Sequence, residues 1–408
     1  MAKPIGRRDA GEDERTLGSP ALGLVWFGAS VSLAEILTGT FYAPLGFERG
    51  MAAVLIGHVI GCVLFWLVAY VSARTGRSAM EAARLSFGRH GAKAFSAMNA
   101  VQLVGWTAIM VASGAAAASF LVPALGMVGW CAVIGALIVL WIAVGMRRMG
   151  KLQSVAGALL AVLCAVVSVT VFGSPDAAAA AAAAGDADAG LSFGAAVELA
   201  VAMPLSWLPV AGDYTRAAKH PIGGTTASTV AYFVGSSWMY AVGLGLALFA
   251  GSDDLASVLA AAGLGVVGIV VVVLSTVTTT FLDARSAGES AHAIHEKLDV
   301  RAVGIVAAIV GTVLAICAPV SGFEEFLYLI GSVFAPMAAV IIADALIARN
   351  DSSARAADWP NLAIWALGFI LYRFSMSWDL PCGNTLPVMA ATALLVLAVH
   401  AVRKRLAR

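Results

Sequence analysis

One acidic residue stands inside the first long apolar stretch of this 408-residue sequence. Glu35 lies in the run Trp26–Thr40, which is otherwise built of apolar and small polar residues. An acid at the centre of a membrane helix costs on the order of 2.5–3.5 kcal/mol to insert, so it is expected to face a cavity or a partner. Glu35 is therefore the leading candidate for contact with a polar solute. The alternative is a protonated Glu35 that only hydrogen-bonds a neighbouring helix.

Two tryptophans and two polar side chains could bind a flat ring. Gln102 and Trp106 lie one helical turn apart, and Ser206 stands beside Trp207 in a later apolar run. Indole rings pack against aromatic faces, while amides and hydroxyls hydrogen-bond to ring edges. The set predicts a site for a heteroaromatic solute. Tryptophans also fill helix packing or form interfacial belts, and this alternative stays open.

Hydroxyl side chains gather in the segment Leu274–Thr280. In a helix Ser275, Thr278 and Thr279 share one face, because residues three and four apart are neighbours. Hydroxyl and carbonyl oxygens suit a hard cation such as sodium. Such side chains also commonly bond a carbonyl of their own helix. Cation binding and simple packing are both open on this spacing.

Charged residues at the ends of apolar runs predict a different role. Asp213, Asp283 and Arg285 are expected to form gating or structural ion pairs. The apolar runs hold no HExxH motif, no paired acidic motif for prenyl diphosphates and no serine–histidine arrangement, so an intramembrane enzyme is not predicted. The five cysteines lack CxxC spacing, and neither a disulfide framework nor a metal cluster or cofactor is expected.

The composition places these residues in a membrane. The sequence is 61% hydrophobic and 12% charged, whereas soluble domains are roughly half apolar and a quarter charged. A helix needs about 20 apolar residues to cross the hydrocarbon core, which leaves room for about a dozen crossings and no separate soluble domain. The apolar runs are continuous, unlike the alternating strands of outer-membrane barrels. An all-α polytopic protein is predicted, with twelve spans near residues 21–45, 50–73, 95–122, 125–146, 150–172, 192–214, 224–251, 256–284, 302–319, 325–347, 360–377 and 384–402.

Positive residues alternate along the predicted connectors. Lys and Arg cluster after the even-numbered spans, at 74–93, 147–151, 216–219, 285–301 and 349–355, whereas the connectors after odd-numbered spans are neutral or acidic. Short cytoplasmic loops hold such positive charge. Both ends of the chain, residues 1–20 and 403–408, are therefore expected in the cytoplasm of a bacterium, with the spans in its inner membrane. Arg373, near the outer end of the eleventh span, is the one exception.

Two predicted spans are interrupted in corresponding places. The first contains the small polar run Gly28–Ser32, and the sixth contains Pro204 and Pro209. Discontinuous helices in matching positions of two halves mark transporters with inverted repeats and a midplane site, because unwound backbone is tolerated only where it lines a protein-enclosed cavity. Kinks that serve packing are the alternative. A channel would instead show a pore loop or a charged ring.

The halves give the domain organisation. Residues 21–172 form the first predicted repeat and residues 192–347 the second, each of five spans. The Ala-rich connector 173–191 is expected outside the cell, and residues 348–402 supply two additional spans. A substrate site between the interrupted spans follows from this arrangement.

At these residues the sequence resembles the nucleobase:cation symporter-1 family, the cytosine-permease group, and within it the branch of hydroxymethylpyrimidine transporters (CytX-type). The matching stretches are Ala53–Gly57, Val104–Trp106, Gly212–Arg216, Val277–Thr279 and Val340–Asp344. The resemblance implies a five-plus-five inverted-repeat (LeuT-like) core with two extra helices, alternating access, and uptake of a pyrimidine-like ring driven by sodium or protons. A monomer in the lipid bilayer without nucleic-acid partners is expected.

The resemblance also implies roles for single residues. Trp106 would stack on the ring, Ser206 would contact it from the broken sixth span, and Ser275 stands where cytosine permease has a substrate-contacting asparagine. The sodium site would combine the hydroxyls of Thr278 and Thr279 with backbone carbonyls of the first span near Ser32.

Departures from the permease pattern narrow the expected substrate. Gln102 is displaced by one residue from the glutamine of the permease, Met203 replaces a second serine, and Glu35 and Trp207 are further differences. A carboxyl group can pair at two points with the ring nitrogen and exocyclic amine of a 4-aminopyrimidine. The sequence therefore predicts import of hydroxymethylpyrimidine, a thiamine precursor. The alternative is cytosine, allantoin, or another nucleobase or amino acid carried by the same fold.

Overall fold

The computed structural model describes residues 15–144, 146–173, 190–249, 265–317 and 322–406. The expected cytoplasmic tail up to residue 14, the Ala-rich connector at 174–189 and the last two residues lie outside the described residues, as do 145, 250–264 and 318–321. Within the described ranges the regular structure is helical, and Leu17 and Ala218 form an isolated β-bridge. The predicted all-α class is confirmed.

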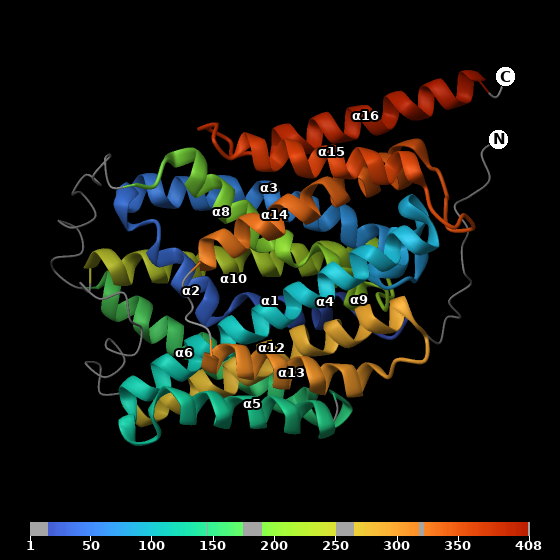
Figure 1. Ribbon diagram of the computed structural model, residues 1–408. Helices are drawn as coiled ribbons and strands as arrows, with labels where there is room; N and C mark the ends of the chain where they lie inside the picture. Colours follow the sequence, from blue (N-terminus) through green and yellow to red (C-terminus); the bar gives the residue numbers. More distant parts are fainter. Residues whose placement is uncertain (1–14, 145, 174–189, 250–264, 318–321, 407–408) are drawn as a thin grey trace.

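The helices follow one another along the whole chain (Figure 1). Their bounds are α1 Ser19–Ser30, α2 Leu33–Thr40, the 3-10 turn η2 Ala43–Leu45, α3 Gly46–Thr75, α4 Ala79–Leu121, η3 Pro123–Leu125, α5 Gly126–Val144, α6 Met146–Phe172, α8 Phe193–Ser206, α9 Leu208–Thr215, α10 Pro221–Phe249, α12 Gly265–Ile294, α13 Val300–Cys317, α14 Phe323–Ile341, the π-helical turn η4 Ile342–Ala348, α15 Trp359–Ser375 and α16 Thr385–Leu406.

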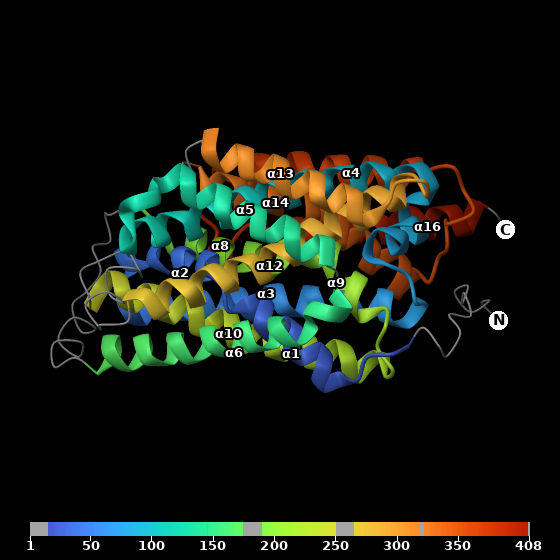
Figure 2. The ribbon, with the colours of Figure 1, turned by 90° about the horizontal axis from the view of Figure 1, so that it is seen from below.

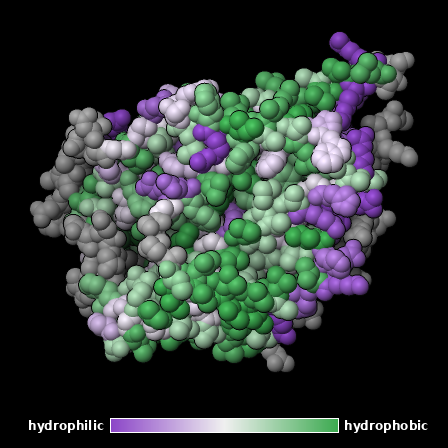
Figure 3. All heavy atoms as spheres, viewed as in Figure 1, coloured by the Kyte–Doolittle hydropathy of each residue, from purple (hydrophilic) through white to green (hydrophobic). Residues whose placement is uncertain are grey.

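Each of the twelve predicted spans coincides with a helix or a helix pair. Eight helices in the described part are long and apolar enough to cross a membrane, and the bent pair α1–α2 adds a ninth. The shorter apolar segment Ala158–Phe172 in α6, together with α12 and α15, corresponds to the remaining three predicted spans. Apolar side chains cover much of the face in Figure 3; hydrophilic ones lie along the end where the C-terminus lies and in smaller patches toward the upper left.

Two predicted boundaries were wrong. The third span was expected to begin near residue 95, but α4 begins at Ala79, where Ser78 and Glu81 form a reciprocal capping box. A kink at Gly88, with φ of 73°, divides this polar first part from the apolar part. Likewise α12 continues to Ile294, about three turns beyond the expected end. Polar residues can end an apolar run while the helix itself continues. Hydropathy therefore placed the start of the third span and the end of the eighth span inside helices that are longer than the apolar runs.

The interrupted helices lie inside the bundle. Helix α1 packs along α10, and α3 packs along both α8 and α10. Helix α4 crosses the bundle beside α12, as both ribbon views show (Figures 1 and 2). The fold thus surrounds α1–α2 and α8–α9 with α3, α4, α10 and α12. The residues proposed above to bind a solute therefore lie on neighbouring elements.

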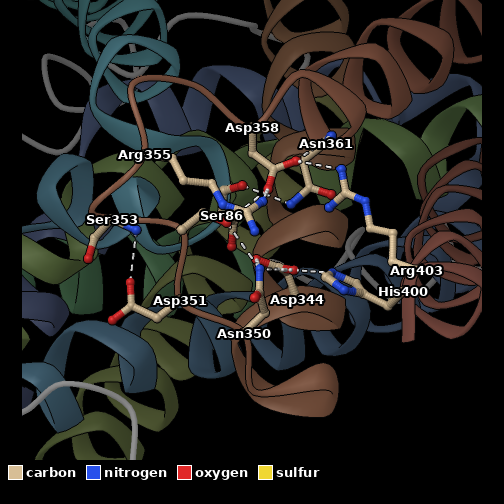
Figure 4. A network of polar contacts seen from close by, with 11 residues as sticks. Ser86, Asp344, Asn350, Asp351, Ser353, Arg355, Asp358, Asn361, His400 and Arg403 are labelled. Carbon is tan, nitrogen blue, oxygen red and sulfur yellow. Dashed lines mark hydrogen bonds and ion pairs between the residues drawn. The ribbon is translucent and has the colours of Figure 1, made fainter. Parts of the chain in front are cut away.

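A polar network joins the last two helices to the core (Figure 4). Asp344 at the start of η4 pairs with His400 of α16. Asp358, the N-cap of α15, pairs with Arg355 at 2.8 Å and with Arg403 of α16 at 3.4 Å. Because His400 and Arg403 lie one turn apart, the two acids hold one face of α16 against the loop between η4 and α15.

Replacing Asp358 is expected to loosen this joint in a pH-dependent way. Burial raises the pKa of Asp358, but hydrogen bonds from Ser352, Asn361 and Arg403 outweigh burial and hold the pKa below its usual range. Stability from a lowered pKa is fully present above the unfolded-state value of about 3.9 and is lost as pH falls through the folded-state value. Asp358→Asn should therefore lower the unfolding temperature most at neutral pH. The difference in unfolding temperature between the variant and the wild type should narrow below about pH 4.

Scanning fluorimetry of both proteins in detergent, from neutral to acidic pH, measures that gap. Asp351→Asn is the matched control, because Asp351 is an exposed carboxylate of the same loop that caps only the Ser353 N–H. A gap for Asp358→Asn that stays constant down to the lowest pH would contradict the assignment.

Candidate functional site

The first interruption lies between α1 and α2, which bend by 50°. The N–H of Val31 and the hydroxyl of Ser30 both donate to the Phe27 carbonyl, at 3.1 and 2.8 Å. Ser32 then begins α2 as its N-cap and accepts from the Glu35 N–H at 3.4 Å. A serine cap offers the backbone an alternative to continuing the first helix. The local sequence therefore creates the break and starts a new helix that carries Glu35.

The second interruption lies at Trp207, between α8 and α9. Pro204 and Pro209 flank it and supply no N–H group, so carbonyls in this segment need other donors. Amide side chains of α4 provide them. Gln102 donates to the Ser206 carbonyl at 3.0 Å, and Asn99 donates to the Pro209 carbonyl at 3.2 Å. The unwound turn is thus held by α4.

The amide of Gln102 has a fixed orientation. Its nitrogen donates both to the Ser206 carbonyl and to Asn99 Oδ1, at 3.0 and 2.8 Å. Asn99 is itself fixed, since its own nitrogen donates to Ser290 Oγ at 2.7 Å. Gln102 Oε1 is buried and no donor among the described residues reaches it. Gln102 Oε1 is therefore an acceptor that an N–H or O–H group of a bound solute would satisfy once the side chains enclosing it open.

The tryptophans lie in two aromatic groups. Trp106 packs edge-on against Phe323 and Phe326, with ring centroids 5.7 and 5.6 Å apart. Trp207 packs edge-on against Trp26 at 5.5 Å. Gln102 lies one turn before Trp106 on the same face of α4. It also donates to the carbonyl of Ser206, the residue directly before Trp207. Gln102 thus lies between the two aromatic groups.

The hydroxyls of α12 are buried. Ser275, Thr278 and Thr279 are at most 5% exposed, and the Thr278 hydroxyl donates to the Ser275 carbonyl at 3.0 Å. The Ser32 carbonyl accepts from the Ile36 N–H at 3.3 Å as the first bond of α2. These hydrogen bonds engage the Thr278 hydroxyl and the Ser32 carbonyl, two of the oxygens expected to bind sodium. The Thr279 hydroxyl remains a buried candidate ligand for the cation. The sodium site stays a prediction.

Glu35 lies on the side of α2 that faces α10. Both of its oxygens accept hydrogen bonds, from the Tyr232 hydroxyl and from Ser236 Oγ, each at 2.7 Å. The side chain is 2% exposed. A ring would reach this carboxylate only if the side chains that enclose it moved. The sequence could not reveal these partners, because about 200 residues separate them from Glu35.

At the predicted cytoplasmic end, the charged residues do not form the expected ion pairs between Asp213 or Asp283 and Arg285. Arg285 pairs with Glu289 at 3.1 Å, and Arg216 reaches the same glutamate at 3.5 Å. Asp213 Oδ1 accepts from the Ala79 N–H at 3.1 Å, and Asp283 is buried in α12. Asp213 and Arg285 both line a cavity of about 460 Å³. Sequence reasoning missed Glu289, whose signal is the i, i+4 spacing from Arg285.

A second buried acid was also missed. Glu198 in α8 accepts from the N–H groups of Asn384 and Thr385 at 2.7 and 2.8 Å, and from the hydroxyls of Thr385 and Tyr372. An acid between Val197 and Leu199 gives the same signal as Glu35. Its partners belong to the two additional helices, so Glu198 joins these helices to the core.

Interrupted helices held by a surrounding helical bundle define a secondary transporter of the LeuT-like fold. Family comparison agrees with this class: residues 10–400 match the model described as permease for cytosine/purines, uracil, thiamine, allantoin. The chain belongs to this family. The proteins of this group that it matches are permeases and transporters, not enzymes.

Relatives and solved structures support the assignment. Cytosine permease of Escherichia coli (strain K12) is 28% identical over 337 residues, which cover 81% of this chain and 77% of that protein. The nucleobase-cation-symport-1 family transporter Mhp1, in a closed conformation with bromovinylhydantoin bound, superposes with a TM-score of 0.81 at 17% identity, covering 99% of this chain and 95% of Mhp1. A Na+-coupled sialic acid symporter superposes with a TM-score of 0.72 at 13% identity, covering 98% and 92% of the two chains. The predicted family and fold are thereby confirmed, and the hydroxymethylpyrimidine branch within the family stays a prediction.

Proposed function

We propose that this protein imports a 4-aminopyrimidine, most specifically hydroxymethylpyrimidine, by cation-coupled symport with alternating access. The single observation that carries the proposal is the fixed amide of Gln102, whose Oε1 lacks a donor. An exocyclic amine supplies that donor, whereas a ring carbonyl at the same place would face Oε1 with a second acceptor. Amino-substituted rings are thereby favoured over uracil-like rings.

The proposed contact set is Gln102, Trp106, Ser206, Trp207 and Ser275. The edges and faces of the indoles offer the flat apolar surface that a small ring needs. The Ser206 hydroxyl donates to the Met203 carbonyl at 2.7 Å, which leaves its oxygen free to accept. Glu35 is left out of this set, because its carboxylate is enclosed between α2 and α10, where it accepts from Tyr232 and Ser236.

Hydroxymethylpyrimidine is favoured over cytosine by one departure from the permease pattern. Met203 stands where the resemblance places a serine, and it is 2% exposed beside the break. The flexible thioether of Met203 can pack against an apolar substituent of the ring, whereas the hydroxyl of the serine would contact a polar ring edge. Cytosine remains the second candidate, because it carries the same exocyclic amine and because the cytosine permease of E. coli is a relative.

We propose sodium as the coupling cation, with the hydroxyls of Thr278 and Thr279 among its ligands. The sialic acid symporter that shares this fold is Na+-coupled, and both hydroxyls are buried on one face of α12. We also propose two five-helix repeats at 21–172 and 192–347, a monomer in the bacterial inner membrane, and both termini in the cytoplasm. The positive residues after the even-numbered spans support this orientation.

A thermal-shift screen tests the proposal. Purified protein is heated with hydroxymethylpyrimidine, cytosine, uracil or allantoin, in sodium chloride and in choline chloride. A ligand at one hundred times its dissociation constant stabilises the folded state by about 2.7 kcal/mol. We expect hydroxymethylpyrimidine to raise the unfolding temperature most, cytosine less and uracil not at all, with larger shifts in sodium. Uracil shifts equal to those of the aminopyrimidines would contradict the role of Gln102.

A further inference from the structure

Glu35 belongs to a buried hydrogen-bonded chain that the ring site does not use. Ser236 Oγ lies 2.7 Å from Glu35 Oε2 and 3.1 Å from His58 Nε2. The other ring nitrogen, His58 Nδ1, lies 3.0 Å from Ser237 Oγ. His58 and Ser236 are fully buried, and Ser237 is 9% exposed. Three helices, α2, α3 and α10, thus contribute to one continuous chain.

This chain has more acceptor atoms than it has fixed hydrogens. Ser236 carries one hydroxyl hydrogen and can donate it either to Glu35 or to His58. When Ser236 donates to Glu35, His58 must donate from Nε2; when Glu35 carries a proton and donates to Ser236, His58 Nε2 accepts. Both arrangements satisfy every member of the chain. The geometry therefore accommodates a proton on Glu35 and equally its departure toward His58.

The surroundings of Glu35 offer no fixed positive charge. The titratable side chains near it are Tyr42, which immediately precedes η2, His58 and Cys62 from α3, and Tyr232 and Tyr240 from α10. None of the salt bridges in the described ranges includes Glu35. An isolated carboxylate in an apolar interior is costly. The neutral acid avoids that cost, whereas a carboxylate balanced by an imidazolium at His58 offsets only part of it and is a short-lived state.

We infer that Glu35 is a proton-binding site, with Ser236, His58 and Ser237 as the path by which its proton enters and leaves. In the first step the Glu35 O–H bond breaks as an O–H bond forms at Ser236 Oγ, and the original Ser236 proton moves to His58 Nε2. A carboxylate and an imidazolium remain, bridged by the serine hydroxyl. In the second step His58 gives its Nδ1 proton to Ser237 Oγ as the original hydroxyl proton of Ser237 passes to a water molecule at its 9% exposed edge, which leaves as hydronium, and the imidazole is neutral again.

The site has a contact route to the proposed ring site. Tyr232 donates to Glu35 and packs edge-on against both Trp26 and Trp207, with ring centroids 6.1 and 6.5 Å apart. A ring that displaced Trp207 would disturb Tyr232 and thereby remove one donor from Glu35. Loss of a donor favours the protonated acid. Ring binding and proton binding are coupled in this way, and only this coupling rests on the proposed function.

Infrared spectroscopy tests the proton site without any substrate. The carbonyl stretch of a protonated carboxylic acid is separate from that of a carboxylate, so difference spectra between two pH values count the acids that titrate. We expect the protonated-acid band of the wild-type protein in lipid to lose one component in Glu35→Gln, while other buried acids such as Asp283 and Asp344 keep theirs. Glu198→Gln is the matched control: it removes another buried glutamate, one whose oxygens accept from two backbone N–H groups, and the component lost in Glu35→Gln should persist.

Transport then tests the path. Proteoliposomes carry labelled hydroxymethylpyrimidine or cytosine at constant sodium while the external pH is varied. A site that must be protonated loses its occupied fraction about tenfold per pH unit above its pKa. Wild-type uptake should fall accordingly, whereas Glu35→Gln, which imitates the neutral acid, should show less than about a twofold change per unit. His58→Gln and Ser236→Ala should keep the infrared band but slow substrate-driven proton entry, read by an internal pH dye.

Two outcomes would overturn the inference. A protonated-acid spectrum that is identical in Glu35→Gln and the wild type assigns the titrating acid elsewhere, even if the ring is transported. Uptake in Glu35→Gln that follows pH as the wild type does would show that Glu35 carries no proton during transport. If no aminopyrimidine is transported but the band still depends on Glu35, the proposed substrate fails and the proton site stands.

Discussion

Gln102→Met is expected to weaken binding of hydroxymethylpyrimidine or cytosine by at least about tenfold and up to roughly a hundredfold. The substitution conserves side-chain volume but removes the acceptor Oε1, so the exocyclic amine of a bound ring would lose its partner inside a buried site. A buried donor without a partner costs about 1–3 kcal/mol. Sites built to hydrogen-bond a substrate also reject partners that cannot form the bond.

The same substitution removes the donors that hold the second helix break. The Ser206 carbonyl and Asn99 Oδ1 would both lose Gln102, so the unliganded protein should also unfold at a lower temperature. Binding of labelled ring measured at saturating sodium separates the two effects, because instability of the empty protein does not remove binding by the folded fraction.

Thr107→Val is the matched control for this prediction. Thr107 lies next to Trp106 on α4, is fully buried, and its hydroxyl donates only to the Leu103 carbonyl of the same helix, at 2.8 Å. Removing that hydroxyl should leave ring affinity unchanged. Equal affinity of Gln102→Met and the wild type would show that the free acceptor does not face the ring.

The sequence predicted the architecture because the relevant signals are local. Apolar runs of sufficient length predicted the spans, and prolines and small polar residues predicted where the first and sixth spans break. The structure has the breaks at Val31–Ser32 and at Trp207, inside the interrupted stretches. The start of α4 at Ala79 was missed because the first part of this helix contains polar residues, so its hydropathy is too low to be counted as part of an apolar run.

The partners of the polar residues could not be predicted. Glu35 and Gln102 were both recognised as polar groups inside spans, yet a sequence does not say which helix each one faces. The structure turns Gln102 toward the broken sixth span and Glu35 toward α10. Both contacts join residues more than 100 positions apart. Glu35, which the sequence suggested as a substrate contact, is thereby proposed as a proton-binding site.

Gly243→Ala is expected to prevent stable folding of the crossing between α2 and α10. A Cβ atom at Gly243 would lie 1.9 Å from the Ile36 carbonyl oxygen and 3.0 Å from the Gly39 Cα. A Cβ at Gly39 would in turn lie 2.4 Å from the Tyr240 carbonyl oxygen. These neighbours are backbone atoms that cannot rotate away, so the helices must separate. Overpacking of this kind costs about 3 kcal/mol or more.

Gly28→Ala is the matched control for the crossing. Gly28 lies in α1, one helix before, and a Cβ there would meet no atom within 4 Å. Alanine favours a helix over glycine by roughly 0.5–1 kcal/mol, so this variant should be as stable as the wild type or slightly more stable. Size-exclusion profiles and unfolding temperatures in detergent compare the two variants, and a normal profile for Gly243→Ala would refute the close crossing.

The crossing also sets the distances within the proton-binding chain. Glu35 precedes Ile36 on α2, while Tyr232 and Ser236 lie on α10 about three and two turns before Gly243. Helices that separate by even one methyl group would lengthen the 2.7 Å bonds to Glu35 beyond hydrogen-bond range. Any Gly243→Ala protein that does fold in lipid should therefore resemble Glu35→Gln in its pH profile, although its carboxylic acid is still present.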